Sequence, residues 1–299
     1  MAVRDADLSW SRPPMARHRS SHPSSAHELL GRLGRLTAQA LDHAELHRAR
    51  VELAMALQRG LLPAGLPTAP GLWTAARYAP ARNGLDIGGD WYDGFALPDG
   101  TLAFSIGDVQ GHDVEAAAFM GQVRIGLRAL ATGAVDPGEV LGRANELLLS
   151  MAGELFATCT FLRFDPATGE LSDARAGHVP ALWASADGRC GIEDDDAGLP
   201  LGILPGEVYP VTRRVLSEPG AVVLVTDGVV EGPSFPIEEG MTQVLSVVRA
   251  GAEAEPGRLA ADVIKVAERT GHKDDAAVLV LRHDGFHERT GGTEAGTAE

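Results

Sequence analysis

The sequence has few cysteines and no pattern that would make them metal ligands or disulfide partners. Cys159 and Cys190 are its two cysteines, their separation matches no zinc-ligand spacing, and no HExxH or CxxC motif is present. Two thiols establish no disulfide framework, so we expect reduced cysteines. Cys159 lies in the apolar run Thr158 to Phe164 and is expected to be a small core residue.

Long apolar runs and an excess of basic residues are also missing. No segment reaches the roughly 18 apolar residues of a membrane span, and the N-terminus lacks the apolar stretch of a signal peptide. Lys plus Arg total 26 against 41 Asp plus Glu, which gives a net charge of −15. Because nucleic acid and anionic membranes both attract basic surfaces, neither is expected as a partner. We therefore expect a cytoplasmic protein with no membrane contact.

The remaining composition divides the chain into four parts. Residues 1–25 are rich in Ser, Arg, His and Pro, which indicates a disordered tail. Residues 26–62 contain no proline and favour a long helix that ends at Pro63, followed by one domain over 63–283 and a flexible tail over 284–299. Two histidines interrupt the apolar spacing of this helix. Packing on its own domain and a dimerising or signalling role therefore both stay open.

The domain reads as strands in hairpins, then a helix pair, then strands again. The segment after Asp108 would form a helix with apolar residues on nearly every face, which predicts that this helix is buried. Asp136, Pro137 and Glu139 predict the start of the next helix, with Asp136 as its N-cap. This order is not the regular alternation of a parallel fold, so we expect an α+β protein with antiparallel sheets. The predicted strands are 72–78, 91–97, 101–106, 158–164, 170–176, 181–186, 208–216, 221–225 and 276–281, and further helices are predicted over 237–250 and 256–269.

Four aspartates stand at the ends of these strands. Asp90 follows Gly88-Gly89, Asp108 ends the alternating run 101–106, Asp227 follows the apolar run 221–225, and Asp274 precedes 276–281. Any one of them is also an ordinary turn residue. Four carboxylates would repel one another unless their pKa values rise or cations bind. Oxygen ligands suit Mg²⁺ or Mn²⁺ better than zinc.

Five segments in order carry a family resemblance. The chain resembles the bacterial SpoIIE-like branch of the metal-dependent protein phosphatases, the protein phosphatase 2C class, from about Leu57 to Arg282. The resemblance implies an α-β-β-α sandwich of two packed antiparallel sheets flanked by helices, with an N-terminal helical extension. The segments are GGDWYD at 88–93, GDVQGHDVEAAAFM at 107–120, AGHVPAL at 176–182, VTDGVVE at 225–231 and KDDAAVLVL at 273–281.

The resemblance also implies a metal site and a mechanism. Two divalent cations, Mn²⁺ or Mg²⁺, would activate a water that attacks phosphorus. The implied ligands are Asp90, Asp108, the backbone carbonyl of Val109, Asp227 and Asp274. Asp275 is an alternative to Asp274, and Asp93 is expected to reach the ions through water. No side chain is assigned as the acid catalyst: His112 is a weak candidate, and Gln110 stands where animal-type members of the class have a histidine.

The resemblance implies a phosphoserine or phosphothreonine phosphatase. Its expected substrate is a phosphorylated anti-sigma-factor antagonist. The 25 residues before the predicted helix are too few for a sensor domain. Regulation is then expected from a separate protein or from self-association through the N-terminal helix. Two alternatives stay open: an inactive module that binds a phosphoprotein, and a hydrolase of small phosphoesters.

Overall fold

The computed structural model describes residues 30–41, 45, 60–80, 88–111, 114–134, 136–151, 155–193, 195–233, 235–271 and 274–286. The chain divides into two units, residues 1–48 and 49–299. The tail predicted over 1–25, His112 and much of the helix predicted over 26–62 lie outside the described residues. In the first unit residues 30–41 are helical, with Leu30, Leu33, Leu36 and Leu41 each more than 60% exposed. Among the described helices, none has the length and apolar character needed to span a membrane.

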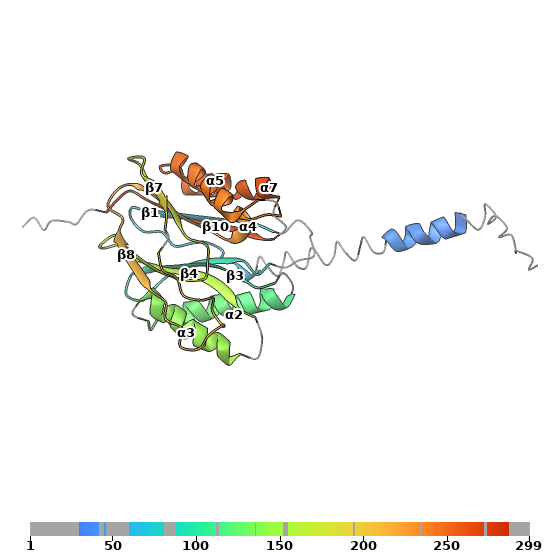
Figure 1. Ribbon diagram of the computed structural model, residues 1–299, viewed down its shortest axis with the longest axis horizontal. Coiled ribbons are helices and arrows are strands. Elements are labelled where there is room, and N and C mark those ends of the chain that lie inside the picture. The colour runs from blue at the N-terminus through green and yellow to red at the C-terminus, as the bar shows by residue number, and fades with distance from the viewer. Residues whose placement is uncertain are drawn as a thin grey trace, which may run out of the picture. The chain divides into compact units, whose positions relative to one another are not determined.

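Two five-stranded antiparallel sheets form the centre of the second unit (Figure 1). The order of sheet A is β1 (Leu72–Ala79), β10 (Ala276–His283), β9 (Gly220–Val225), β6 (Leu182–Ser185) and β7 (Cys190–Ile192). The order of sheet B is β2 (Trp91–Ala96), β3 (Leu102–Val109), β4 (Ala157–Phe164), β5 (Glu170–Ala176) and β8 (Val211–Val215).

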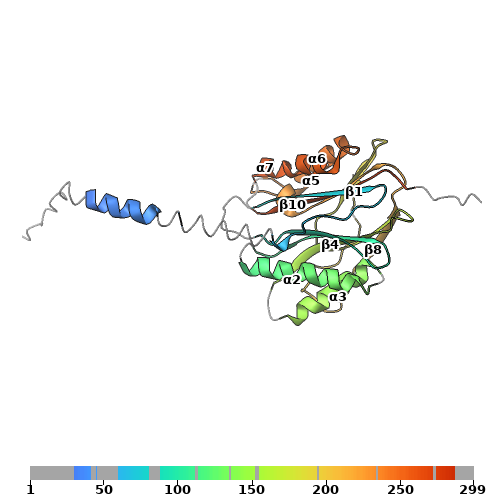
Figure 2. The ribbon, with the colours of Figure 1, turned by 180° about the vertical axis from the view of Figure 1, so that it is seen from behind.

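Helices cover the outer face of each sheet (Figures 1 and 2). Sheet B carries α2 (Val114–Ala131) and α3 (Pro137–Ser150). Sheet A carries α5 (Ile237–Ala250) and α6 (Pro256–Ile264), with the short helices α4 (Asp227–Val230) and α7 (Val266–Thr270) beside them. The predicted α-β-β-α sandwich is confirmed.

Apolar side chains fill three layers of this sandwich. Phe104, Leu162, Leu224 and Leu279 belong to the layer between the two sheets. A second layer lies between sheet B and its helices, and a third between sheet A and its helices. Strand β9 lies inside sheet A and is covered on both faces, so every residue from Gly220 to Val225 is buried.

Local signals in the sequence account for several element boundaries. The side chain of Asp136 accepts a hydrogen bond from the backbone N–H of Glu139 at 3.0 Å, so the predicted N-cap of α3 is confirmed. Strand β3 continues past the predicted end at residue 106 and reaches Val109, because Asp108 and Val109 still pair with β4. The sequence pattern did not predict β7, a three-residue edge strand.

Two expectations about packing need correction. Helix α2 is not buried all round: Val114 is 64% exposed and Ile125 is 54% exposed, because the helix meets the sheet along one face only. The packed chain also continues beyond the boundary predicted after residue 283. The backbone N–H of Phe286 donates to the Leu216 carbonyl at 2.7 Å, and its ring meets that of Phe164 edge-on at 5.2 Å between centroids.

Candidate metal centre

Sheet B brings the first two predicted ligands together. Trp91 of β2 pairs with Gly107 of β3, so the same register places Asp90 opposite Asp108. The pairing continues one step further, since the Val109 N–H donates to the Gly89 carbonyl at 3.3 Å. Asp90 is 2% exposed. Two carboxylates therefore face each other at the end of a buried strand pair.

Sheet A supplies the other two. Asp227 opens α4 one residue after Thr226, which follows the end of β9, and Asp274 lies just before β10. Strands β9 and β10 are antiparallel, so the end of one lies beside the start of the other. Asp227 and Asp274 both line a cavity of about 170 Å³, together with Glu231.

The charges of the two sheets act on one another. Burial raises the pKa of Asp90 well above its usual range, and the neighbouring carboxylates of Asp108 and Asp227 raise it further. Burial and the Asp227 charge raise the pKa of Asp108 to about 8. Burial and the Asp274 charge likewise raise the pKa of Asp227. The structure thus brings all four predicted aspartates into one electrostatic cluster, where cations would relieve the repulsion.

Two glycines allow the chain to approach this cluster closely. A Cβ on Gly89 would overlap the carbonyl oxygen of Val109 and stand 3.1 Å from Asp108 Oδ1. A Cβ on Gly88 would overlap the carboxylate of Asp275 and the hydroxyl of Tyr78. The Gly88-Gly89 pair is therefore required for the close packing of oxygen atoms at this end of the sandwich.

The donor set fits hard divalent cations in its chemistry. Every predicted ligand atom is an oxygen from a carboxylate or a backbone carbonyl, which Mg²⁺ and Mn²⁺ prefer. Within the described part of the chain, no three His, Cys, Asp or Glu side chains converge as a ready-made site for a single ion. The carboxylates are close enough to shift one another's pKa values, and mutual repulsion opposes any closer approach. Asp90, Asp108, the Val109 carbonyl, Asp227 and Asp274 thus remain the predicted ligands.

The neighbouring residues take different places. Asp275 is fully buried and hydrogen-bonded to Tyr78, whose pKa is raised by burial and by the charges of Asp90 and Asp275. Asp274 is exposed and accepts a hydrogen bond from the Asp275 N–H at 2.8 Å. This arrangement favours Asp274 over Asp275 as the carboxylate open to an ion.

Asp93 contacts helix α2. Its carboxylate forms ion pairs with Arg124 at 3.1 Å and with Arg128 at 2.7 Å, and it also accepts from the Gly94 N–H at 2.8 Å. These contacts join β2 to α2 on the outer face of sheet B. The predicted link from Asp93 to the ions through water stays a prediction.

Two of the family segments contain a histidine, His112 in 107–120 and His178 in 176–182. His112 lies outside the described residues. His178 is 3% exposed, its Nδ1 lies 2.9 Å from the Thr158 hydroxyl, and burial lowers its pKa to about 3. A neutral, buried His178 fits a role in packing.

Thr226 and Tyr78 were not among the predicted site residues. Thr226 is fully buried and its hydroxyl donates to Asp90 Oδ2 at 2.7 Å. Its position directly before the predicted ligand Asp227 was the one sequence feature that could have indicated a place in the site. The sequence around Tyr78 has no such feature, because nothing in β1 indicates that the Tyr78 hydroxyl contacts Asp275, about 200 positions later in the chain.

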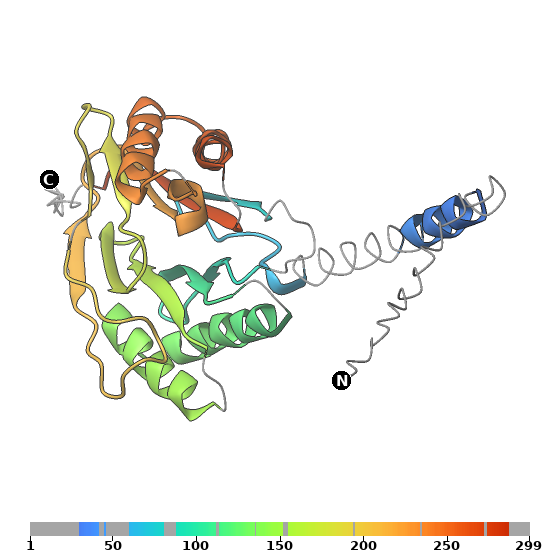
Figure 3. The same cartoon turned by 45° about the vertical axis from the view of Figure 1, so that its right-hand side comes forward.

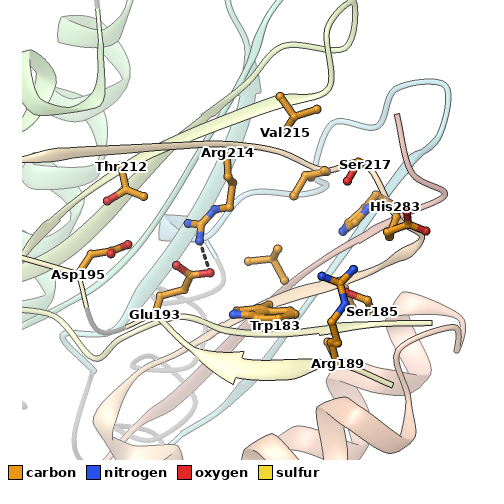
Figure 4. Close-up of a pocket in the computed structure, with 15 residues that line it drawn as sticks. Trp183, Ser185, Arg189, Glu193, Asp195, Thr212, Arg214, Val215, Ser217 and His283 are labelled. Carbon is orange, nitrogen blue, oxygen red and sulfur yellow. Dashed lines mark ion pairs between the residues drawn. The ribbon is translucent and has the colours of Figure 1, made fainter. Parts of the chain in front are cut away.

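A larger cavity of about 420 Å³ lies elsewhere (Figure 4). Its lining residues come in part from the β6–β7 hairpin and from β8, which lie on the same side of the second unit (Figure 3). The cavity adjoins the start of β9 and the end of β10, whereas Asp227 and Asp274 lie at the opposite ends of these strands. Arg214 in its wall forms ion pairs with Glu193 and Asp173. Arginine side chains of the wall thus stand beside its carboxylates, unlike among the described residues around Asp90, Asp108, Asp227 and Asp274.

The family model of Stage II sporulation protein E (SpoIIE) matches residues 98–284, more than half of the chain. The chain belongs to the SpoIIE family. The resemblance to the SpoIIE-like branch of the metal-dependent protein phosphatases is thereby confirmed, and the matched segment contains Asp108, Asp227 and Asp274.

Relatives and a solved structure agree with this SpoIIE assignment. Protein IcfG of Synechocystis is 29% identical over 77% of this chain and 40% of its own length. Phosphoserine phosphatase RsbU of Bacillus subtilis is 25% identical over 62% of this chain and 54% of its own. The crystal structure of the RsbU and RsbW domains of Rv1364c from Mycobacterium tuberculosis is 32% identical with a TM-score of 0.67, over 76% of this chain and 64% of that one. The chain thus spans only about half the length of the curated relatives it matches.

Proposed function

We propose that this SpoIIE-family chain is a Mn²⁺- or Mg²⁺-dependent phosphatase that hydrolyses phosphoserine or phosphothreonine in a protein. The observation that carries the proposal is the cluster of the buried Asp90 with the half-buried Asp108 and Asp227, in which burial and neighbouring carboxylates raise the pKa of each. A cluster of this kind has a strong affinity for cations. The relative from Bacillus subtilis is named a phosphoserine phosphatase, which supports the same substrate class here.

Residues from both sheets would bind the cations. Asp90, Asp108 and the Val109 carbonyl on sheet B, with Asp227 and Asp274 on sheet A, would hold two divalent cations. When bound, such ions supply an activated water and compensate the charge of the phosphoryl oxygens. The Gly88-Gly89 turn keeps space for the oxygen atoms, and the exposed Asp274 lies where a phosphoprotein has access.

We propose a phosphorylated anti-sigma-factor antagonist in the cytoplasm as the substrate. The support is the family assignment and the solved neighbour that contains RsbU and RsbW domains. The exposed leucines of residues 30–41 support a further role for that helix in self-association or in binding a separate regulator. A helix that leaves such a row of leucines exposed gains stability when a partner covers it.

The test is dephosphorylation of a phosphorylated antagonist, followed by mass spectrometry with and without Mn²⁺. Asp90→Ala and Asp227→Ala are expected to lose at least about 100-fold in rate, since each removes a predicted ligand. Asp262→Ala, an exposed aspartate on α6, is the matched control and should keep full activity. Retained activity in the first two variants would reject the metal assignment. A tight complex without turnover would indicate a binding module, and faster turnover of p-nitrophenyl phosphate than of any phosphoprotein would indicate a small-phosphoester hydrolase.

A further inference from the structure

The hydroxyl of Thr226 lies at the junction of the two sheets. Thr226 follows β9, precedes Asp227 and is fully buried. Its backbone N–H donates to the Ala277 carbonyl of β10 at 3.1 Å. The residue is therefore held firmly on sheet A by its main chain.

The hydrogen bonds of the hydroxyl have a defined direction. Its oxygen accepts from the Ala277 N–H at 2.8 Å, and an N–H group can only donate. The single hydroxyl proton is thus available for Asp90 Oδ2, which lies 2.7 Å away and is 136 residues distant in the chain. One side chain connects β10 of sheet A to the first carboxylate of sheet B.

This connection joins two parts of the predicted ligand set. Asp90 and Asp108 come from sheet B, whereas Asp227 and Asp274 come from sheet A. Ions shared between the sheets require that the carboxylates on the two sides stand in a fixed relation. Hydrogen bonds that orient ligands in this way affect metal affinity strongly.

We propose that Thr226 is a positioning residue: its hydroxyl orients Asp90 relative to Asp227, and divalent-ion affinity depends on it. This inference rests on the proposed metal-dependent function. It concerns a residue that contacts a predicted ligand and is not itself one of the predicted ligands. The inference is therefore tested by measuring metal affinity rather than the rate of catalysis.

The experiment measures Mn²⁺ affinity by isothermal titration calorimetry on the metal-free full chain. Thr226→Val keeps the shape and removes the hydroxyl, and Thr226→Ser keeps the hydroxyl. We expect the valine variant to lose about 10- to 100-fold in affinity and the serine variant to stay close to the wild type. Thr160→Val is the matched control: Thr160 is 2% exposed in β4 and its hydroxyl has no hydrogen-bond partner among the residues that the structure describes, so the Mn²⁺ affinity of this variant should be unchanged.

Thermal unfolding of the same metal-free proteins separates positioning from simple support of the fold. A purely structural Thr226 would lower the melting temperature of Thr226→Val and leave the Mn²⁺ affinity of the folded protein unchanged, which would overturn the inference. Equal affinity losses in the serine and valine variants would also overturn it. If Thr226→Val does not fold, Thr226→Cys takes its place, because the thiol fills similar space and is a weak donor. A wild-type chain that binds no Mn²⁺ would instead reject the proposed function.

Discussion

The metal-free protein should become less stable as the pH rises from 6.5 to 8.5. Burial and the Asp227 charge raise the pKa of Asp108 from 3.8 to about 8. Over this range the unfolded chain has already released the Asp108 proton, whereas the folded chain holds it until the pH passes about 8. Because the folded state binds more protons, the free energy of unfolding falls with increasing pH.

The size of the effect follows from the shift in pKa. Each unit corresponds to about 1.4 kcal/mol, so Asp108 alone should remove about 2 kcal/mol between pH 6.5 and 8.5. The histidines act below this window. Burial lowers the pKa of His178 to about 3 and that of His283 to about 4, so their contribution is complete above pH 6.5 and is lost as the pH falls below it.

The assay is urea unfolding followed by circular dichroism at pH 6.5, 7.5 and 8.5, with a chelator present. Asp108→Asn carries no titrating carboxyl at this position and should show a smaller decline than the wild type, while Asp90 and Asp227, whose pKa values are also raised, still contribute. Saturating Mn²⁺ should also remove the decline, because the cations replace the protons. A metal-free wild type whose unfolding free energy stays level or rises over this range would refute the reasoning, as would an Asp108→Asn variant with the wild-type slope.

Two further substitutions test the packing around the cluster. Gly89→Ala should cost about 1–3 kcal/mol and weaken Mn²⁺ binding, because the new methyl overlaps the Val109 carbonyl. Gly142→Ala in α3, whose Cβ would meet its nearest atom at 4.0 Å, should be neutral or stabilising in the same urea unfolding. Asp93→Ala should cost about 3–5 kcal/mol in thermal unfolding, since it leaves the largely buried Arg124 without its charge partner. Loss of the exposed ion pair in Asp187→Ala should leave the melting temperature unchanged, and equal effects in the two aspartate variants would contradict this account.

Much of the fold follows from short-range patterns in the sequence. The alternating run before Asp108 predicts a strand with one buried face, because successive side chains point to opposite faces of a sheet. The continuous apolar run before Asp227 predicts a strand that is buried on both faces. The start of α3 follows from a cap that involves only Asp136 and Glu139. Such signals act within a few residues and need no tertiary contact.

Other features depend on contacts that a single sequence does not reveal. The apolar character of α2 does not indicate which face meets the sheet, and Ile125 is on the exposed one. The Thr226–Asp90 hydrogen bond joins residues 136 positions apart. The direction of the Asp93 side chain could have been predicted from the alternation of side chains along a strand. Asp93 lies three residues after Asp90, so the two side chains point to opposite faces of sheet B. That spacing agrees with the contact between Asp93 and α2.

The most direct measurement is anomalous diffraction from crystals of the protein grown with Mn²⁺. The account predicts two Mn²⁺ peaks between the sheets, within ligand distance of Asp90, Asp108, the Val109 carbonyl, Asp227 and Asp274. Peaks confined to other surfaces, with these oxygen atoms free of metal, would contradict it.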